Sequence, residues 1–516
     1  MELTGKNIVY VGGFGGIGEK TVEAFLKKSV KSVLILDLQS NDEYLKYLQS
    51  TYKNSVVAYI PVDLTKTDSI REAFQKAKEQ INTFDVVVNG AGIGNELNID
   101  RIVQINLIGV IHSSLIAMDY MSKENGGQGG CIVNISSTSG LNPTALLCIY
   151  GTTKSGLNYF TNTLAKPLYF EKSGVSFITI CPGVVITPMM NDASNLISAK
   201  YFPNVDRVFN SAIHQTPTVF AENLMKVLET ATNVIFCHSR ISFHWEVTVV
   251  RRQSHRIVSI MELKGKNVIY VGGFGGIGEK CIESFLMNSV KSLLVFDLHC
   301  NEEFLNYLQN TYKQVYVDYI HLDISKGENI RTAFKKAKDK ISTFEVVVNG
   351  AGIIDEGKIN QIVQINLTGL IQYMSKANGG QGGYIVNISS IAGLNPCEIF
   401  SIYGVTKSAV LHFTRALGKS VYFNKTGVSF ITICPGGTAS PMFEQALSKF
   451  MGLKYLPELI SKLEWVEPQG AETFANNLMI VLKIAANGST WILDNGKIEE
   501  ITFPEIWGPV VQFCNL

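Results

Sequence analysis

The chain has 516 residues, which is too long for one ordinary hydrophobic core, so we expect two or more domains. Hydrophobic residues make up 46% and charged residues 17% of the sequence, which is typical of a globular protein, and the net charge of +1 favours neither nucleic acid nor an anionic membrane. The nine cysteines contain no C-x-x-C pair and the eight histidines no metal-binding spacing. We therefore expect a cytoplasmic protein with reduced thiols, no metal and no signal peptide.

Residues 7–37 form an apolar strand, a glycine-rich turn, an amphipathic helix and a second apolar strand that ends in an acid. In a G-x-G-x-x-G turn, the first glycine permits the tight turn, the second lets backbone approach a pyrophosphate, and the third lets helix and strand pack closely. The helix N-terminus then faces the phosphates. An acid at the end of the second strand binds the ribose hydroxyls and repels a 2′-phosphate, which predicts NAD rather than NADP. The predicted contacts here are Gly13, Gly15, Gly16, Ile17, Gly18 and Asp37.

Short β-branched runs alternate with helical periods along the rest of this half of the chain, as in parallel βαβ units. We predict strands near residues 7–11, 32–36, 56–60, 85–89, 131–135 and 175–181. A longer apolar run at 105–118 is interpreted as a buried or interface helix, too short and too polar to span a bilayer. The predicted fold is α/β, a Rossmann-type doubly wound parallel sheet.

The whole pattern occurs twice. Four motifs recur: YVGGFGGIGEK at 10–20 and 270–280, VVVNGAGI at 86–93 and 346–353, NGGQGG at 125–130 and 378–383, and GVSFITICPG at 174–183 and 427–436. The offset falls from 260 to 253 residues, so the second copy lacks seven residues after Asn366, which shortens a helix by roughly 10 Å. We infer a tandem duplication of one domain.

The two copies differ most where they join. We assign the first domain to 1–233, a junction to 234–260 and the second domain to 261–516. The second copy has a candidate seventh strand at 491–494, whereas the first copy lacks a recognisable equivalent. The junction contains no Gly or Pro and is followed by a restart at Met261. We consider two hypotheses: translated non-coding sequence between two joined genes, or a genuine basic linker.

A tyrosine and a lysine four residues apart share one face of a helix at Tyr150 and Lys154. An ammonium near a phenol favours the phenolate, so the lysine is expected to lower the pKa of the tyrosine and make it a usable base. Ser137, just after a predicted strand, can hydrogen-bond a substrate oxygen. The second copy repeats this set as Ser390, Tyr403 and Lys407, with the same spacing from serine to tyrosine.

With these motifs, the chain resembles two tandem classical short-chain dehydrogenases, and is most similar to insect-type alcohol dehydrogenases and to the NAD-dependent 15-hydroxyprostaglandin dehydrogenase type. The resemblance covers nearly all of each copy outside the junction. It implies Asn106 and Asn366 as active-site asparagines beside the two Ser-Tyr-Lys sets. It also implies that both lysines, Lys154 and Lys407, contact the cofactor. The further cofactor contacts that it implies in the first copy are Asp63, Asn89, Gly90, Ala91, Pro182, Gly183 and Thr187. In the second copy they are Gly273, Gly275, Gly276, Ile277, Gly278, Asp297, Asp323, Asn349, Gly350, Ala351, Pro435, Gly436 and Ser440.

The resemblance implies metal-free, NAD-dependent interconversion of an alcohol and its ketone or aldehyde. In the family the lysine also holds the nicotinamide ribose, and the asparagine holds a water that relays the proton. The lid regions at 188–218 and 441–470 carry methionine and aromatic residues, which suggest an apolar pocket for a small apolar alcohol or carbonyl compound, although ordinary core packing explains these residues equally well. Family members usually form dimers, so a homodimer or an intramolecular pseudo-dimer is expected. The alternative is a weakly active or inactive binding or storage protein on the same scaffold.

Overall fold

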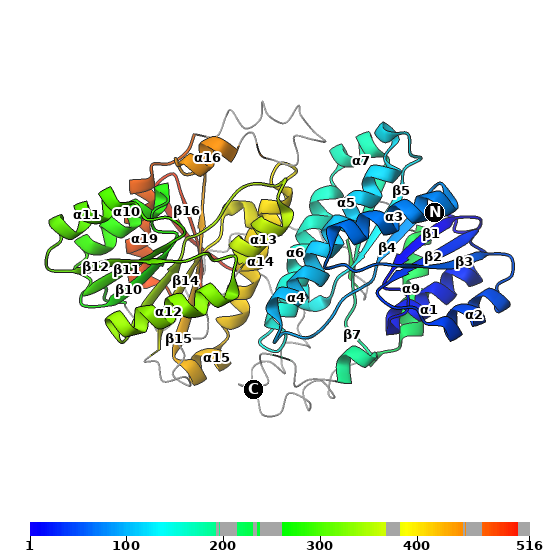
Figure 1. The fold of residues 1–516 in the computed structure, drawn as a ribbon, viewed down its shortest axis with the longest axis horizontal. Helices are drawn as coiled ribbons and strands as arrows, with labels where there is room; N and C mark the ends of the chain where they lie inside the picture. Colours follow the sequence, from blue (N-terminus) through cyan, green and yellow to red (C-terminus); the bar gives the residue numbers. More distant parts are fainter. Residues whose placement is uncertain are drawn as a thin grey trace. The chain divides into compact units, whose positions relative to one another are not determined.

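The computed structural model describes residues 1–191, 196, 214–230, 235–237, 261–367, 382–446, 449 and 467–503. These residues fall into two compact units, one within 1–245 and the other within 246–505, and each is described here by itself (Figure 1). The predicted position of the missing seven residues, as well as most of both lid regions and of the junction, lies outside the described residues.

The first unit is built on a parallel sheet with the strand order β3-β2-β1-β4-β5-β6-β9, so the chain reverses direction of winding between β1 and β4. This is the doubly wound arrangement, in which ligands bind at the carboxyl ends of the strands near the reversal. The six predicted strands are confirmed to within one residue at each end. The strands are β1 (Asn7–Val11), β2 (Ser32–Asp37), β3 (Val56–Pro61), β4 (Val86–Asn89), β5 (Gly130–Ile135), β6 (Val175–Cys181) and β9 (Ile235–Cys237).

A seventh strand is present in the first unit, so the expectation that its last strand is missing is wrong. Strand β9 pairs in parallel with β6, with Thr179 opposite Ile235 and Cys181 opposite Cys237. The sequence hid this strand because only three residues pair, which is below the length that an alternation pattern can reveal. The backbone groups at the edge of β6 would otherwise lack strand partners. The domain boundary therefore lies beyond residue 233.

Helices cover both faces of the first sheet. Side chains on alternate residues of the strands, such as Ile8 and Tyr10 of β1, join one apolar core with Val22 and Phe25 of α1 and Leu224 of α9. Figure 1 shows α1 and α9 on one side of the sheet and α3, α5 and α6 on the other. The helices are α1 (Gly16–Lys27), α2 (Asp42–Thr51), α3 (Thr67–Ile81), α4 (Ile99–Val103), the π-helix η1 (Gln104–Gly109), α5 (Val110–Met121), α6 (Cys148–Leu164), α7 (Pro167–Ser173) and α9 (Pro217–Thr230).

The elements α4, η1 and α5 run on as one helical stretch, Ile99–Met121. Among the described residues it is long and apolar enough to cross a membrane by length and composition, so the expectation that the apolar run is too short and too polar is wrong. Within the structure, 72% of its most apolar window is buried, as in a core helix. The interpretation as a buried helix agrees with this placement.

The second unit repeats the same order as β12-β11-β10-β13-β14-β15-β16-β17. The predicted seventh strand is confirmed as part of β16, and an antiparallel strand, β17, follows it. The strands are β10 (Asn267–Val271), β11 (Ser292–Asp297), β12 (Tyr316–His321), β13 (Val346–Asn349), β14 (Gly383–Ile388), β15 (Val428–Pro435), β16 (Thr490–Asp494) and β17 (Lys497–Ile501). The helices are α10 (Gly276–Met287), α11 (Glu302–Thr311), α12 (Gly327–Ile341), α13 (Ile359–Leu367), α14 (Ser401–Leu417), α15 (Ser420–Thr426), α16 (Pro441–Ala446) and α19 (Ala471–Ile484).

Candidate active site

The glycine-rich turn between β1 and α1 is shaped by close backbone contacts. Helix α1 begins at Gly16, with Gly15 as its N-cap residue. A Cβ atom on Gly18 would lie 2.3 Å from the carbonyl oxygen of Gly12, so no larger residue fits there. A Cβ atom on Gly15 would have only one neighbour within 4 Å among the described residues, the carbonyl oxygen of Gly12 at 3.4 Å. The turn therefore leaves room for a phosphate beside the N–H groups of the helix N-terminus.

The residue that makes the tight turn is Gly12, which lies just before the predicted G-x-G-x-x-G pattern. Gly12 has a φ of +84°, and a Cβ atom there would lie 2.6 Å from the backbone of Ala91. Only glycine adopts this conformation without strain. The motif assigned the turn to Gly13, but Gly13 packs against Ile35. A Cβ atom on Gly13 would lie 2.8 Å from the Cγ2 atom of Ile35. The signal was the double glycine that precedes Phe14.

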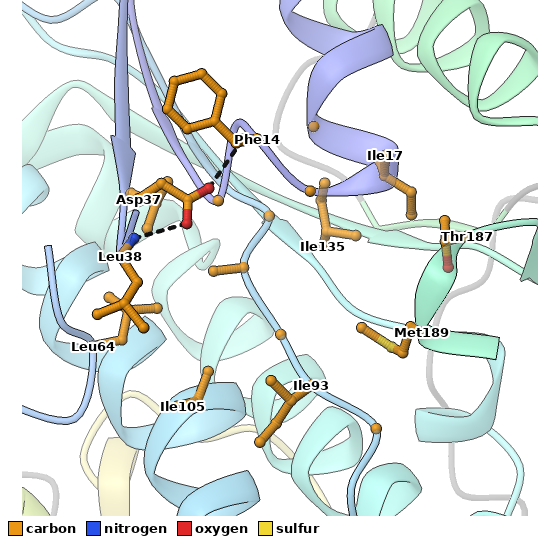
Figure 2. A pocket seen from close by; sticks show the side chains of 18 of the residues that line it. Phe14, Ile17, Asp37, Leu38, Leu64, Ile93, Ile105, Ile135, Thr187 and Met189 are labelled. Carbon is orange, nitrogen blue, oxygen red and sulfur yellow. Dashed lines mark hydrogen bonds between the residues drawn. The ribbon is translucent and has the colours of Figure 1, made fainter. Parts of the chain in front are cut away.

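Two acids lie at the carboxyl ends of neighbouring strands. Asp37 accepts hydrogen bonds from the backbone N–H groups of Phe14 (3.0 Å) and Leu38 (2.8 Å), which tie the glycine turn to the end of β2 (Figure 2). Burial raises the pKa of the Asp37 carboxyl, and these two hydrogen bonds oppose that shift. Asp63 accepts from the backbone and hydroxyl of Thr65, which hold the pKa of its carboxyl below the ordinary value.

The serine, tyrosine and lysine come together beyond the end of β5. Tyr150 lies in the first turn of α6, and the nearby Ser137 hydroxyl acts to lower the pKa of its phenol. Lys154, one turn later, donates to the carbonyl oxygen of Ile135 at 2.8 Å. Its Nζ atom lies 5.7 Å from the centre of the Tyr150 ring. The predicted face of the helix thus points at the strand end where Ser137 lies.

In the protein without bound cofactor, the pKa of Tyr150 is not lowered by the lysine as predicted but raised. Burial raises the pKa of Tyr150 to about 12, and the hydrogen bond from Ser137 only partly opposes it. Burial also lowers the pKa of Lys154 to about 8. Desolvation disfavours the charged form of both groups and is the largest cause of both shifts. The ammonium nevertheless remains mostly protonated at neutral pH.

Asn106 lies in the π-helical segment η1 and holds the loop that follows β4. Its Oδ1 atom accepts from the N–H of Ile93 and its Nδ2 atom donates to the carbonyl of Ile93, both at 2.8 Å. Its Nδ2 atom also lies 3.5 Å from the Thr153 hydroxyl oxygen on α6. Short π-helical segments inside helices are common at functional sites.

Asn89 ends β4 and is buried beneath the same loop. Its Nδ2 atom donates to Ser114 (3.0 Å) and to Asn134 (2.8 Å), and its Oδ1 atom accepts from Ser113. It does not line the cavity described next, so its contribution is to fix the backbone on which Gly90 and Ala91 are carried.

These elements enclose a cavity of about 890 Å³ in the first unit. Figure 2 shows Asp37 and Leu38 at one end, and Thr187 and Met189 at the other. The predicted site residues that line it are Gly15, Ile17, Gly18, Asp37, Asp63, Gly90, Ala91, Ser137, Tyr150, Lys154, Pro182, Gly183 and Thr187, whereas Gly13, Gly16, Asn89 and Asn106 are not among the lining residues.

A nicotinamide dinucleotide fits the chemistry of these residues. The glycine turn offers N–H donors for phosphates, Asp37 offers acceptors for ribose hydroxyls, and the volume lies in the range of small-molecule sites. The Lys154 ammonium has three N–H donors and uses one on Ile135, which leaves donors for a ribose at the cavity wall. In the part of the chain that the structure describes, no group of three potential metal ligands occurs.

The second unit repeats most of these side-chain contacts. Burial raises the pKa of Tyr403 to about 12 and lowers that of Lys407 to about 8, and Ser390 again acts to lower the pKa of the phenol. Asn366 exchanges both hydrogen bonds with Ile353, at 2.9 and 3.0 Å. Asp297 accepts from the N–H of Phe274, as Asp37 does from Phe14. Three further correspondences are that Gly272 takes the positive φ before Gly273, that Gly276 packs beside Ser440, and that Asp323 accepts from Ser325.

The comparisons with known proteins agree with this arrangement. The family model described as short chain dehydrogenase matches residues 6–196 and 266–449, which together are well over half of the chain. Alcohol dehydrogenase 1 of Ceratitis cosyra is 34% identical over 233 residues, which are 45% of this chain and 91% of that protein. Fat body protein 2 of Drosophila melanogaster is 31% identical over 250 residues, 47% of this chain and 97% of that protein.

One solved structure matches both units together. The N-domain of a bacterial malonyl-CoA reductase, determined with NADP, covers 96% of this chain and 98% of its own, with a TM-score of 0.67 and 13% identity. At that identity the likeness shows the fold alone. It matches the predicted tandem of Rossmann-type domains.

The fold and the family match define an oxidoreductase that uses a nicotinamide dinucleotide, as predicted. The chain belongs to the short-chain dehydrogenase family, as two tandem copies of the family domain similar to the insect alcohol dehydrogenases.

Proposed function

We propose that the chain is an NAD-dependent alcohol dehydrogenase that converts a small apolar alcohol to its ketone or aldehyde. The observation that carries this proposal is the convergence of Ser137, Tyr150 and Lys154 on one cavity with the glycine turn. The second unit repeats the three residue types with the same burial of the tyrosine and the lysine. The alcohol dehydrogenases of Ceratitis support the substrate class.

The roles follow from what each side chain can do. Ser137 donates a hydrogen bond to the substrate oxygen, and Tyr150 accepts the hydroxyl proton. The cationic Lys154 stabilises the phenolate that forms before that transfer and holds the ribose of the cofactor. When bound, NAD supplies the hydride acceptor. The carbinol thus loses a proton from its oxygen, which Tyr150 takes, and a hydride from its carbon, which the cofactor would accept, and a carbonyl group remains.

The preference for NAD over NADP rests on Asp37. Its carboxylate lines the cavity and is fixed by two backbone N–H groups, so it cannot easily swing away from a 2′-phosphate. Burial of two negative charges together is strongly unfavourable. Asp297 has the same hydrogen bonds in the second unit.

The substrate end of the cavity is apolar in its described part. Leu147, Met189 and Leu196 line it beside Tyr150. The other lid residues on which the prediction rested, among them Phe202, Phe209, Phe450 and Trp465, lie outside the described residues. We further propose a cytoplasmic enzyme in which the two units form an intramolecular pseudo-dimer or a homodimer, which light scattering of the full chain would test.

Reduction of NAD by a panel of primary and secondary alcohols tests the proposal. We expect NADH formation by the full chain, and a loss of about 100-fold or more when Tyr150→Phe and Tyr403→Phe are combined. The double variant should still bind NADH, measured by nicotinamide fluorescence. Retained NADH binding with no turnover in the parent protein would instead support the binding-protein alternative.

A further inference from the structure

We propose that Glu96, and Glu356 in the second unit, is a positioning residue that holds the catalytic tyrosine in place through the backbone of its helix. We call the contact between this glutamate and the start of the helix the clamp. Its consequence for catalysis rests on the proposed function, whereas the existence of the contact does not. Glu96 is fully buried and is not among the residues that line the cavity.

The contact is made to the tyrosine itself. The Oε1 atom of Glu96 accepts hydrogen bonds from the backbone N–H groups of Ile149 at 2.7 Å and Tyr150 at 2.8 Å. Both residues lie in the first turn of α6, so the carboxylate fixes the Cα position from which the phenol extends. One oxygen atom that accepts two N–H groups leaves little freedom for that turn to slide or rotate.

The helix needs this remote partner. The first N–H groups of a helix have no intrahelical acceptor, and the N-cap residue usually supplies one. The N-cap residue of α6 is Leu147, whose side chain makes no capping hydrogen bond. Glu96 supplies the acceptor from another part of the chain, and the positive end of the helix in turn stabilises the buried carboxylate.

Glu96 also completes a strap across the active site. The loop after β4 carries Gly90 and Ala91 along the cavity, is held by Asn106 at Ile93, and reaches α6 at Glu96. One short loop therefore fixes the spacing between the asparagine and the tyrosine. A displacement of about 1 Å at a reacting group can reduce turnover about 100-fold, so such a strap has catalytic consequences.

The same device recurs in the second unit. The Oε1 atom of Glu356 accepts from Ile402 at 2.8 Å and from Tyr403 at 2.9 Å. The N-cap residue there is Phe400, again without a capping side chain. The chain between acid and tyrosine is seven residues shorter than in the first copy, yet the clamp is the same. Its geometry therefore depends on the local loop and helix and not on the length of the intervening segment.

The test uses the full chain carrying Tyr403→Phe, so that turnover reports the first unit. Glu96→Ala removes the acceptor, and Glu96→Gln keeps a neutral oxygen in the same place. Thr216→Ala is the matched control, because the Thr216 hydroxyl accepts from the N–H of Val219 at the start of α9, which carries no active-site residue. The readouts are kcat, KM for the alcohol, Kd for NADH, and hydrogen exchange of the peptide containing Ile149 and Tyr150.

We expect Glu96→Ala to lower kcat about 100-fold with Kd for NADH within about threefold, and to speed exchange at Ile149 and Tyr150. Glu96→Gln should recover most of the turnover, and Thr216→Ala should match the parent. If Glu96→Ala yields no folded protein, Glu96→Asp, which withdraws the oxygen by one methylene, should show the same selective loss.

Three results would overturn the proposal: unchanged kcat in Glu96→Ala, unchanged exchange at the first turn of α6, or parallel losses of kcat and NADH binding in both Glu96 variants. A parent protein without turnover would contradict the proposed function and leave the clamp to be judged by exchange alone.

Discussion

The two units share the motif Asn-Gly-Ala-Gly but not the environment of its asparagine. In the first unit, Asn89 is hydrogen-bonded to Ser113, Ser114 and Asn134. In the second, Asn349 donates to Asn387 at 2.5 Å, and its buried Oδ1 atom has no hydrogen-bond partner among the residues that the structure describes. The second copy has no serine pair after Ile371, where its sequence reads Gln372-Tyr373.

This difference shows that a motif can be retained while the residues that hydrogen-bond to it, which lie elsewhere in the sequence, are lost. The asparagine was kept in both copies, but the shorter second copy lost the helix residues that complete its hydrogen bonds. A buried polar atom without a partner is destabilising by about 1–3 kcal/mol. We therefore expect the first unit to be the more stable and the more active one.

Removal of the asparagine side chain should give the largest difference in stability loss between the two units. Asn89→Ala leaves the partners on α5 and β5 without their hydrogen bonds, and should lower the free energy of unfolding of the first unit by about 3 kcal/mol. Asn349→Ala should lower that of the second by about 1 kcal/mol, because its Oδ1 atom has no bond to lose among the described residues. Urea unfolding followed by hydrogen exchange reports each unit, and equal losses would refute the comparison.

The buried lysines should respond alike, because their surroundings do not differ. Burial lowers the pKa of Lys154 and of Lys407 to about 8. Between about pH 8 and the unfolded value of about 10.5, the unfolded state binds more protons, so stability rises with pH. Lys154→Met and Lys407→Met should each raise the free energy of unfolding by about 2 kcal/mol at neutral pH.

That advantage should shrink as the pH approaches 10, since the unfolded lysine also becomes neutral. Thermal unfolding over this pH range measures it. An advantage that does not depend on pH would contradict the assignment of the effect to buried charge.

The glycine after the proline of each Pro-Gly turn gives the smallest contrast. A Cβ atom on Gly436 would lie 2.9 Å from the Cβ atom of Asp494 and closer still to its carboxylate, whereas Gly183 has no described atom within 4 Å. Gly436→Ala should be destabilising by about 1–2 kcal/mol. Gly183→Ala should be neutral or slightly stabilising, through the lower entropy of the unfolded chain. Melting temperatures of the two variants test this, and the reverse order would be inconsistent with the packing.

Much of the fold was predictable because strands and glycine turns leave strong local patterns. The runs that became β1 and β6 were placed to the residue, and the duplication located their counterparts. Strand β9 was missed because three residues have no readable period. Such a strand is defined by the neighbouring edge of β6 and not by its own sequence.

The candidate site could be proposed from the sequence as a set of residue types, but the environments of those residues could not. Tyr150 and Lys154 were recognised from their spacing, yet their pKa shifts depend on burial, which no local pattern reports. Glu96 was missed because its partners are backbone N–H groups 53 and 54 residues away. An acid a few residues after the Asn-Gly-Ala-Gly motif in both copies was the only available signal.

The most direct test of the account compares NAD reduction by Tyr150→Phe and Tyr403→Phe, each in the full chain, with NADH affinity measured in parallel. We predict that Tyr150→Phe removes most of the turnover, that Tyr403→Phe removes the smaller part, and that both variants bind NADH as the parent does. Undiminished turnover in the variant that carries both substitutions would contradict the assignment of tyrosine as the base.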